Sequence, residues 1–179
     1  MNKLKNSRCY LCGAMDRVQD GGVGWRTMIR SALSDLGIQW LDPTRKPISI
    51  AAEDDASRKL RKHLKETMDF ETLAKEMKPI RHVDLRMVDI CDWVVVDLNL
   101  DVHACGTYEE IFLANSQKKP VMIRVEQGKK AAPDWLFGTV PHAHIFSAWD
   151  ELFYYIRKVA NGCPNSFGRW YFFDWMGDK

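Results

Sequence analysis

The chain has 179 residues, of which 46% are hydrophobic and 28% are charged, and its 26 Lys and Arg against 24 Asp and Glu leave a formal net charge of +2. These values are typical of one soluble globular domain and exclude fibrous, disordered and disulfide-stapled mini-protein classes. A membrane-spanning helix needs about 18 consecutive apolar residues. The clearest apolar run, residues 93–96, is bracketed by Asp92 and Asp97, so we expect no membrane segment.

The cysteines and the terminal residues indicate a cytoplasmic protein. Five cysteines occur at positions 9, 12, 91, 105 and 163 without regular spacing, which is typical of reduced thiols. No apolar stretch follows the polar residues 1–8, so we expect no secretory signal. The near-zero net charge argues against a dedicated nucleic-acid-binding protein.

Strand-like and helical segments alternate along the chain, which predicts a parallel sheet covered on both faces by helices. Apolar residues at i, i+3, i+4 and i+7 mark the two longest expected helices. In chain order, we expect a strand over 9–12, a helix over 25–36 that Gly37 ends, a strand over 38–41, a helix over 83–90, a strand over 93–98, a helix over 108–116, strands over 121–125 and 144–146, and a helix over 149–159.

Two parts of the chain lie outside this alternation. Residues 44–80 follow a proline, are acidic at 53–55 and then basic at 58–65, so we expect an irregular lid or insertion. Residues 161–179 form a tail with six aromatic residues between positions 167 and 175, which must pack on the same domain or on a partner subunit. With no repeat to divide it, we expect the chain to form one domain over residues 1–179.

Ligands of an open parallel sheet bind beyond the carboxyl ends of its strands, so the residues after the first strand are candidates. Gly13 and Asp16 follow this strand, and glycines at 21, 22 and 24 lead into a helix whose N–H groups could meet an anion. The segment matches neither the Walker nor the dinucleotide fingerprint. A flexible glycine loop without special chemistry explains it equally well.

The residues around the third strand are the second group of candidates. Asp97, Asn99 and Asp101 follow the strand and could hold sugar hydroxyls. Gly106 and Thr107 then open a helix that carries Glu109 and Glu110, and only one of this adjacent pair can face a cleft. Acids that favour the helix dipole explain both equally well. Asp84, at the start of the helix before the third strand, is either a helix cap or a functional acid.

The cysteine and histidine residues predict no metal or redox site. Cys9 and Cys12 lie three apart on an expected strand and so face opposite sides of the sheet. The histidines at 103, 142 and 144 are expected to be loop or strand-end residues, and no second cysteine pair completes a zinc site. We therefore expect no metal and no organic cofactor.

Five segments come in the order and spacing of the nucleoside 2-deoxyribosyltransferase family, which the chain resembles over roughly residues 8–160. They are Tyr-Leu-Cys-Gly-Ala-Met at 10–15, Asp-Leu at 84–85, Ile-Cys-Asp-Trp-Val-Val-Val at 90–96, Gly-Thr-Tyr-Glu-Glu-Ile-Phe-Leu-Ala at 106–114 and Lys-Pro-Val at 119–121. The resemblance implies a flavodoxin-like, doubly wound five-stranded sheet. It also implies an enzyme that exchanges bases on deoxyribosides or hydrolyses deoxynucleoside monophosphates.

Carried over by position, the resemblance gives three residues a catalytic role. Glu110 corresponds to the nucleophile, Asp84 to the acid that meets the departing base, and Tyr10 to the tyrosine that orients the nucleophile. A carboxylate can capture the oxocarbenium-like centre as a covalent glycosyl-enzyme while a second acid assists the leaving base. Transfer to another base or to water then completes the reaction. The family also implies a homo-oligomer.

The chain departs from the family at three positions. Ala104 stands where the transferases have Asp and the monophosphate hydrolases have Ser. Ala14 and Asp16 stand where the hydrolases favour Ser and Arg, so the phosphate-binding residues of the hydrolases are missing. The sequence therefore leaves both a nucleoside and a nucleotide as possible substrates. Ala104 favours the alternative of a binding or sensing module with the same fold. The basic residues 58–65 leave a nucleic-acid accessory role as a weaker alternative.

Overall fold

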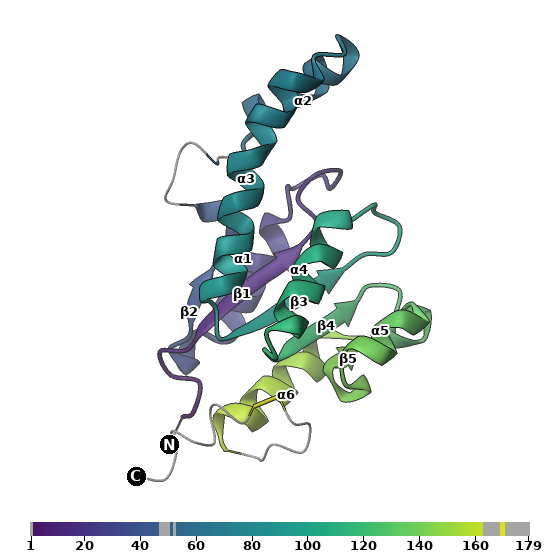
Figure 1. The fold of residues 1–179 in the computed structure, drawn as a ribbon. Helices are drawn as coiled ribbons and strands as arrows, with labels where there is room; N and C mark the ends of the chain where they lie inside the picture. The colour runs from purple at the N-terminus through teal and green to yellow at the C-terminus, as the bar shows by residue number, and fades with distance from the viewer. Residues whose placement is uncertain (1, 47–50, 52, 163–168, 171–179) are drawn as a thin grey trace.

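The computed structural model of the protein describes residues 2–46, 51, 53–162, 169 and 170. Its centre is a sheet of five parallel strands in the order β2-β1-β3-β4-β5 (Figure 1). The strands are β1 (Arg8–Gly13), β2 (Gln39–Leu41), β3 (Trp93–Leu98), β4 (Val121–Val125) and β5 (Ile145–Phe146). This order is that of a flavodoxin-like sheet, and the expected fold class is confirmed.

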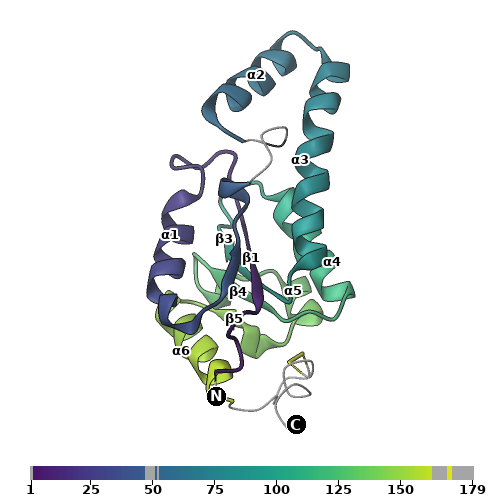
Figure 2. The same ribbon diagram turned by 90° about the vertical axis from the view of Figure 1, so that its left-hand side faces the viewer.

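Helices cover both faces of the sheet (Figure 2). One face is covered by α1 (Val23–Ala32) and α6 (Trp149–Ala160), the other by α3 (Phe70–Ile90), α4 (Cys105–Ser116) and α5 (Asp134–Thr139). Successive β3 residues alternate between two cores, Trp93 and Val95 on the α1 side and Val94 and Val96 on the α3 side. A strand buried on both faces explains the uninterrupted apolar run in the sequence.

The prediction of an irregular stretch over residues 44–80 is wrong. Most of it is helical, comprising α2 (Asp55–Glu66) and the first half of α3, which begins at Phe70 rather than at residue 83 and contains Pro79. The two helices form a hairpin that projects beyond the carboxyl ends of the strands (Figures 1 and 2). Asp54 and Asp69 cap them by accepting hydrogen bonds from the N–H groups of Ser57 and Thr72.

Smaller differences concern element ends. The expected helix over 25–36 is α1 followed by a 3-10 turn, η1 (Ser34–Leu36), after which Gly37 takes a left-handed conformation with φ 62°. His144 belongs to a 3-10 turn, η5 (His142–His144), so β5 is shorter than expected. Short turns also follow β2 and β4, namely η2 (Pro43–Arg45) and η4 (Lys129–Ala131).

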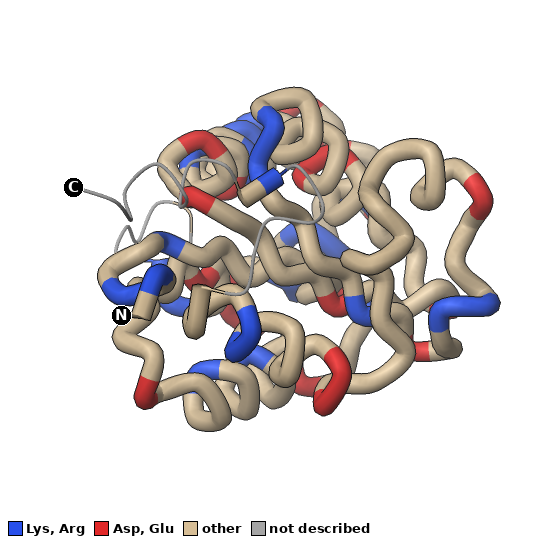
Figure 3. The backbone as a smooth tube through the Cα atoms, turned by 90° about the horizontal axis from the view of Figure 1, so that it is seen from below, with Lys and Arg blue, Asp and Glu red and all other residues tan. Residues whose placement is uncertain are grey.

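Trp170 of the aromatic tail packs on the chain's own domain. Its indole is 2% exposed, lies 5.9 Å from Trp93 between ring centroids, and donates a hydrogen bond to the Tyr155 hydroxyl. The other aromatic residues of the tail lie outside the described residues. Over the described chain, acidic and basic residues are interspersed along the backbone (Figure 3).

Candidate active site

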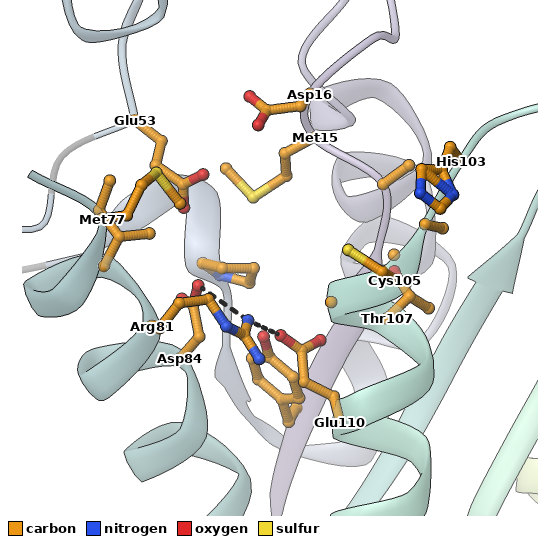
Figure 4. A pocket seen from close by; sticks show the side chains of 17 residues that line it. Met15, Asp16, Glu53, Met77, Arg81, Asp84, His103, Cys105, Thr107 and Glu110 are labelled. Carbon is orange, nitrogen blue, oxygen red and sulfur yellow. Dashed lines mark hydrogen bonds and ion pairs between the residues drawn. The ribbon is translucent and has the colours of Figure 1, made fainter. Parts of the chain in front are cut away.

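A cavity of about 190 Å³ opens beyond the carboxyl end of β1, between α3 and the start of α4 (Figure 4). Seven of the ten candidate residues line it: Tyr10, Gly13, Asp16, Asp84, Gly106, Thr107 and Glu110. The other three, Asp97, Asn99 and Asp101, are not among its lining residues. Met77 of α3 and Glu53, just before α2, form the wall opposite α4.

Glu110 faces the cavity from α4, whereas its neighbour Glu109 faces solvent. Glu110 is 5% exposed and lies on the same face of the helix as Thr107, Ile111 and Ala114, all of which are buried. Residues three and four apart share one face of a helix, so packing of this face against the sheet fixes where the carboxylate points. Glu109 lies about 100° around the helix, with its side chain 55% exposed.

Both carboxylate oxygens of Glu110 are hydrogen-bonded. Arg81 Nη1 donates to Oε1 at 2.9 Å, and the Cys12 thiol donates to Oε2 at 3.0 Å. Burial, reinforced by the Glu110 charge, raises the pKa of Cys12 well above its usual value, which keeps the thiol protonated and able to donate. The sequence reasoning missed both partners, although Arg81 precedes Asp84 by three residues and so shares a helix face with it.

Arg81 also joins Glu110 to the other candidate acid. Its Nη1 lies 3.8 Å from Asp84 Oδ2 (Figure 4). Its Nη2 pairs with Glu109. Burial alone would lower the pKa of Arg81, but the hydrogen bonds and charges of Glu110 and Glu109 outweigh burial and raise it. Arg81 is therefore a permanent cation between two carboxylates.

Asp84 lies inside α3, whose N-cap is Asp69, so the helix-cap interpretation of Asp84 is wrong. Its carboxylate is buried, and Lys46 Nζ lies 2.8 Å from Oδ1. Burial raises the pKa of Asp84 to about 6, the nearby Lys46 opposes this rise, and the charges of Glu53 and Glu110 add to it. A carboxyl group with this pKa can give and take a proton near neutral pH.

Tyr10 and Gly13 place β1 beneath the cavity. Tyr10 is 1% exposed, and burial, together with the Glu110 charge, raises the pKa of its phenol well above the usual value, which keeps it neutral. A Cβ on Gly13 would lie 2.9 Å from the Asp97 carbonyl oxygen and 3.0 Å from the Trp25 ring. Close packing between strand and helix thus accounts for glycine at position 13.

The glycine loop, for which the sequence allows either an anion site or a plain loop, uses two of its N–H groups within the loop. Asp20 accepts hydrogen bonds from the N–H groups of Gly22 and Gly24 at 2.8 and 2.7 Å, so these donors are already used. Asp16, at the cavity wall, pairs with Arg61 of α2 at 3.0 Å. The loop and the hairpin are therefore linked by an ion pair across the cavity mouth.

The polar residues at the carboxyl end of β3 are turned towards β4 and the loop that follows it. Asp97 pairs with Arg124 at 2.7 Å, while Asn99 and Asp101 accept hydrogen bonds from the Gln127 amide at 2.8 and 2.9 Å. Burial raises the pKa of Asp97, and the Arg124 hydrogen bond opposes the rise. The structure does not bring these three side chains together with Glu110.

Cys9 and Cys12 lie in opposite cores, as their spacing on a strand predicts. Among the described residues, no three His, Cys, Asp or Glu side chains gather as a possible metal-ligand set. His144 is buried against Tyr155, and its Nε2 lies 2.7 Å from the tyrosine hydroxyl. His103 instead lines the cavity, opposite Met77 (Figure 4).

Within the described ranges, no helix combines the length and the apolar character that crossing a membrane requires. No protein-family model and no curated protein sequence matches the chain. Solved structures do match it. A 2-deoxyribosyltransferase from Bacillus psychrosaccharolyticus has a TM-score of 0.55 at 13% identity and covers 82% of this chain and 90% of its own.

Two further solved structures are similar. A conserved protein from Enterococcus faecalis V583 has a TM-score of 0.52 at 13% identity, covering 86% of this chain and 99% of its own. The CMP N-glycosidase BcmB from Clostridium botulinum has a TM-score of 0.43 at 14% identity, covering 86% of this chain and 98% of its own. At 13% identity, the two structures with TM-scores of 0.55 and 0.52 show that the chain shares their fold, and the fold of the 2-deoxyribosyltransferase fits the resemblance seen in the sequence.

Proposed function

We propose that the protein cleaves the N-glycosidic bond of a deoxyribonucleoside or its monophosphate and passes the deoxyribosyl group to another base or to water. The main observation behind this proposal is that Glu110 and Asp84 line the same cavity and that Arg81 contacts both. The similarity of the fold to a 2-deoxyribosyltransferase supports the same reaction class.

Glu110 is the nucleophile in this proposal. A carboxylate oxygen offers about two lone pairs, so a carboxylate with one donor on each oxygen keeps free electron pairs for the anomeric carbon. Arg81 and Cys12 fix the carboxylate in one orientation, which reduces the entropy lost on reaching the reactive geometry. Attack forms the bond from Glu110 to the anomeric carbon as the bond to the base breaks.

Asp84 is the acid that assists the departing base. Its pKa of about 6 leaves a protonated fraction at neutral pH, and the carboxyl O–H can donate to a base nitrogen as the glycosidic electrons move onto that nitrogen. The resulting carboxylate then takes a proton from the incoming base or from water. Tyr10, neutral beneath the cavity, is proposed to orient the sugar and Glu110.

Incubation with deoxynucleosides and their monophosphates, with and without a second free base, tests the proposal through chromatography of released and exchanged bases. Glu110→Gln is expected to abolish release and the deoxyribosyl mass adduct on the protein. Glu76→Gln, on the exposed side of α3, is the control and is expected to leave release unchanged. Absence of base release or exchange from every substrate would refute the proposed activity.

The second candidate function is a sensing module that binds a nucleoside without cleaving it. Ala104 favours this candidate, because it lines the cavity with a methyl group at a position where the related enzymes carry a polar residue. A ligand-dependent rise in melting temperature without any product would support sensing. Product formation that depends on Glu110 would exclude it.

A further inference from the structure

Lys46 is a buried lysine that joins the segment after η2 to Asp84 of α3. It directly follows η2, and its side chain is 2% exposed. The ammonium nitrogen lies 2.8 Å from Asp84 Oδ1 and 2.5 Å from Glu53 Oε1. A buried ammonium group needs close counter-charges, so these two carboxylates fix where it lies.

Lys46 is placed to act on Asp84 rather than on a substrate. Asp84 and Glu53 both line the cavity that contains Glu110, whereas Lys46 is not among the lining residues of that cavity. Lys46 lines instead a neighbouring cavity of about 370 Å³, which Glu53 also borders. The ammonium group thus contacts Asp84 without lining the cavity in which the substrate is proposed to bind.

Charged or titratable groups from every packed element surround Asp84. The groups that face it are Lys46 after η2, Glu53 before α2, Arg81 on its own helix, Glu110 from α4 and Tyr10 from β1. Of these, Lys46 makes the shortest ion pair with Asp84, whereas Arg81 Nη1 lies closer to Glu110 than to Asp84. Lys46 is therefore the main cation acting on Asp84, and Glu53 competes for it.

We infer that Lys46 is a positioning residue for the acid step: it orients Asp84 and stabilises the carboxylate that forms when Asp84 gives its proton to the departing base. Glu53 sets how much of this positive charge reaches Asp84. The inference rests on the proposed function. The proton that leaves Asp84 goes to the base nitrogen with the glycosidic electron pair, and the new carboxylate remains beside the Lys46 ammonium.

Two substitutions are expected to move the titration of Asp84 in opposite directions. Lys46→Met removes the positive charge, so the pKa of Asp84 should rise by roughly one unit or more. Glu53→Gln removes a negative charge and frees Lys46 for Asp84, so the pKa should fall. Lys46→Arg keeps the charge and should retain a titration near that of the wild type. Lys62→Met, on the exposed face of α2, is the control and should change nothing.

The readout is the carboxyl carbon signal of Asp84 in a pH titration by nuclear magnetic resonance, alongside the pH profile of kcat/KM. We expect the basic limb of the profile to move with the Asp84 titration in each variant. Titration of Asp84 at the same pH in wild type, Lys46→Met and Glu53→Gln would overturn the inference, as would shifts of the same sign.

The two measurements separate this inference from the proposed function. If the titrations shift as expected but no base is released from any substrate, the coupling of Lys46 to Asp84 stands and the proposed activity falls. If base is released but the titrations do not move, the activity stands and the role of Lys46 falls. Where Lys46→Met fails to fold, the downward shift in Glu53→Gln and the retained titration in Lys46→Arg carry the test.

Discussion

The thiol of Cys12 gives a prediction that distinguishes catalysis from packing. Cys12 is fully buried on β1, and its Sγ donates to Glu110 Oε2 at 3.0 Å. A hydrogen bond to a charged group contributes about 1.5–3 kcal/mol, and a thiol is a weak donor, so we use the lower end of this range. A rise of about 1.4 kcal/mol in the activation free energy slows a reaction tenfold. If loss of the bond that orients Glu110 raises the barrier by this amount, Cys12→Ala should lower kcat roughly tenfold.

Cys9 provides the matched control for this prediction, because it is equally buried on the same strand but faces the opposite core. Cys9→Ala should cost a similar amount of stability while leaving kcat within about twofold of wild type. Cys12→Ser keeps a donor and should recover much of the loss, with KM little changed. Steady-state assays of base release measure all three. An equal fall of kcat in the Cys9 and Cys12 alanine variants would refute the role of the thiol.

Three further predictions concern the tail, the acid response and the substrate charge. Trp170→Ala should lower the free energy of unfolding by about 3–5 kcal/mol, measured by chemical denaturation. Trp135 is 75% exposed, so Trp135→Ala should lower it by less than about 0.5 kcal/mol. Burial lowers the pKa of His144 to about 4, so the unfolded chain takes up this proton at a higher pH than the folded protein. The free energy of unfolding should therefore fall as the pH drops from 6.5 to 4. Asp84 opposes this fall, because its raised pKa of about 6 makes protonation stabilise the folded state as the pH drops. Asp84→Asn should therefore enlarge the loss of unfolding free energy between pH 7 and pH 4.5, measured by denaturation at both pH values. An unchanged loss would contradict this. Arg61 already pairs with Asp16, so it is not available to bind a 5′-phosphate. The kcat/KM for deoxynucleosides should therefore be at least tenfold above that for their 5′-monophosphates, and Asp16→Asn should reduce this difference.

The sheet could be predicted from the sequence because its strands are buried on both faces. The apolar run of β3 is visible without any partner, and the stripes of α1 and α6 follow from packing on one face. The first half of α3 was missed for another reason. Phe70, Leu73, Met77 and Ile80 recur at helical spacing, but this half projects beyond the sheet, most of its residues contact solvent, and Pro79 suggests a break where the helix continues.

The candidate site was only partly predictable for a related reason. Glu110 and Asp84 came from segments whose order resembles a known family, and both line one cavity. Their partners come from distant parts of the chain: Cys12 is 98 residues from Glu110. A single sequence gives no signal for such a contact, since strand pairing and helix packing decide it. Asp97, Asn99 and Asp101 lie at a strand end too, but their partners Arg124 and Gln127 hold them on the side of β4, away from the cavity.

Two carboxyl groups near one arginine can take different roles only if their surroundings differ. Glu110 lies close to Arg81 and receives a donor on each oxygen, an arrangement that suits a fixed, charged nucleophile. Asp84 is farther from Arg81, and Glu53 shares the ammonium group that faces it, so burial dominates and its pKa rises to about 6. Lys46 and Glu53, which lie between β2 and α2, therefore set the difference between the two acids on which the proposed reaction depends.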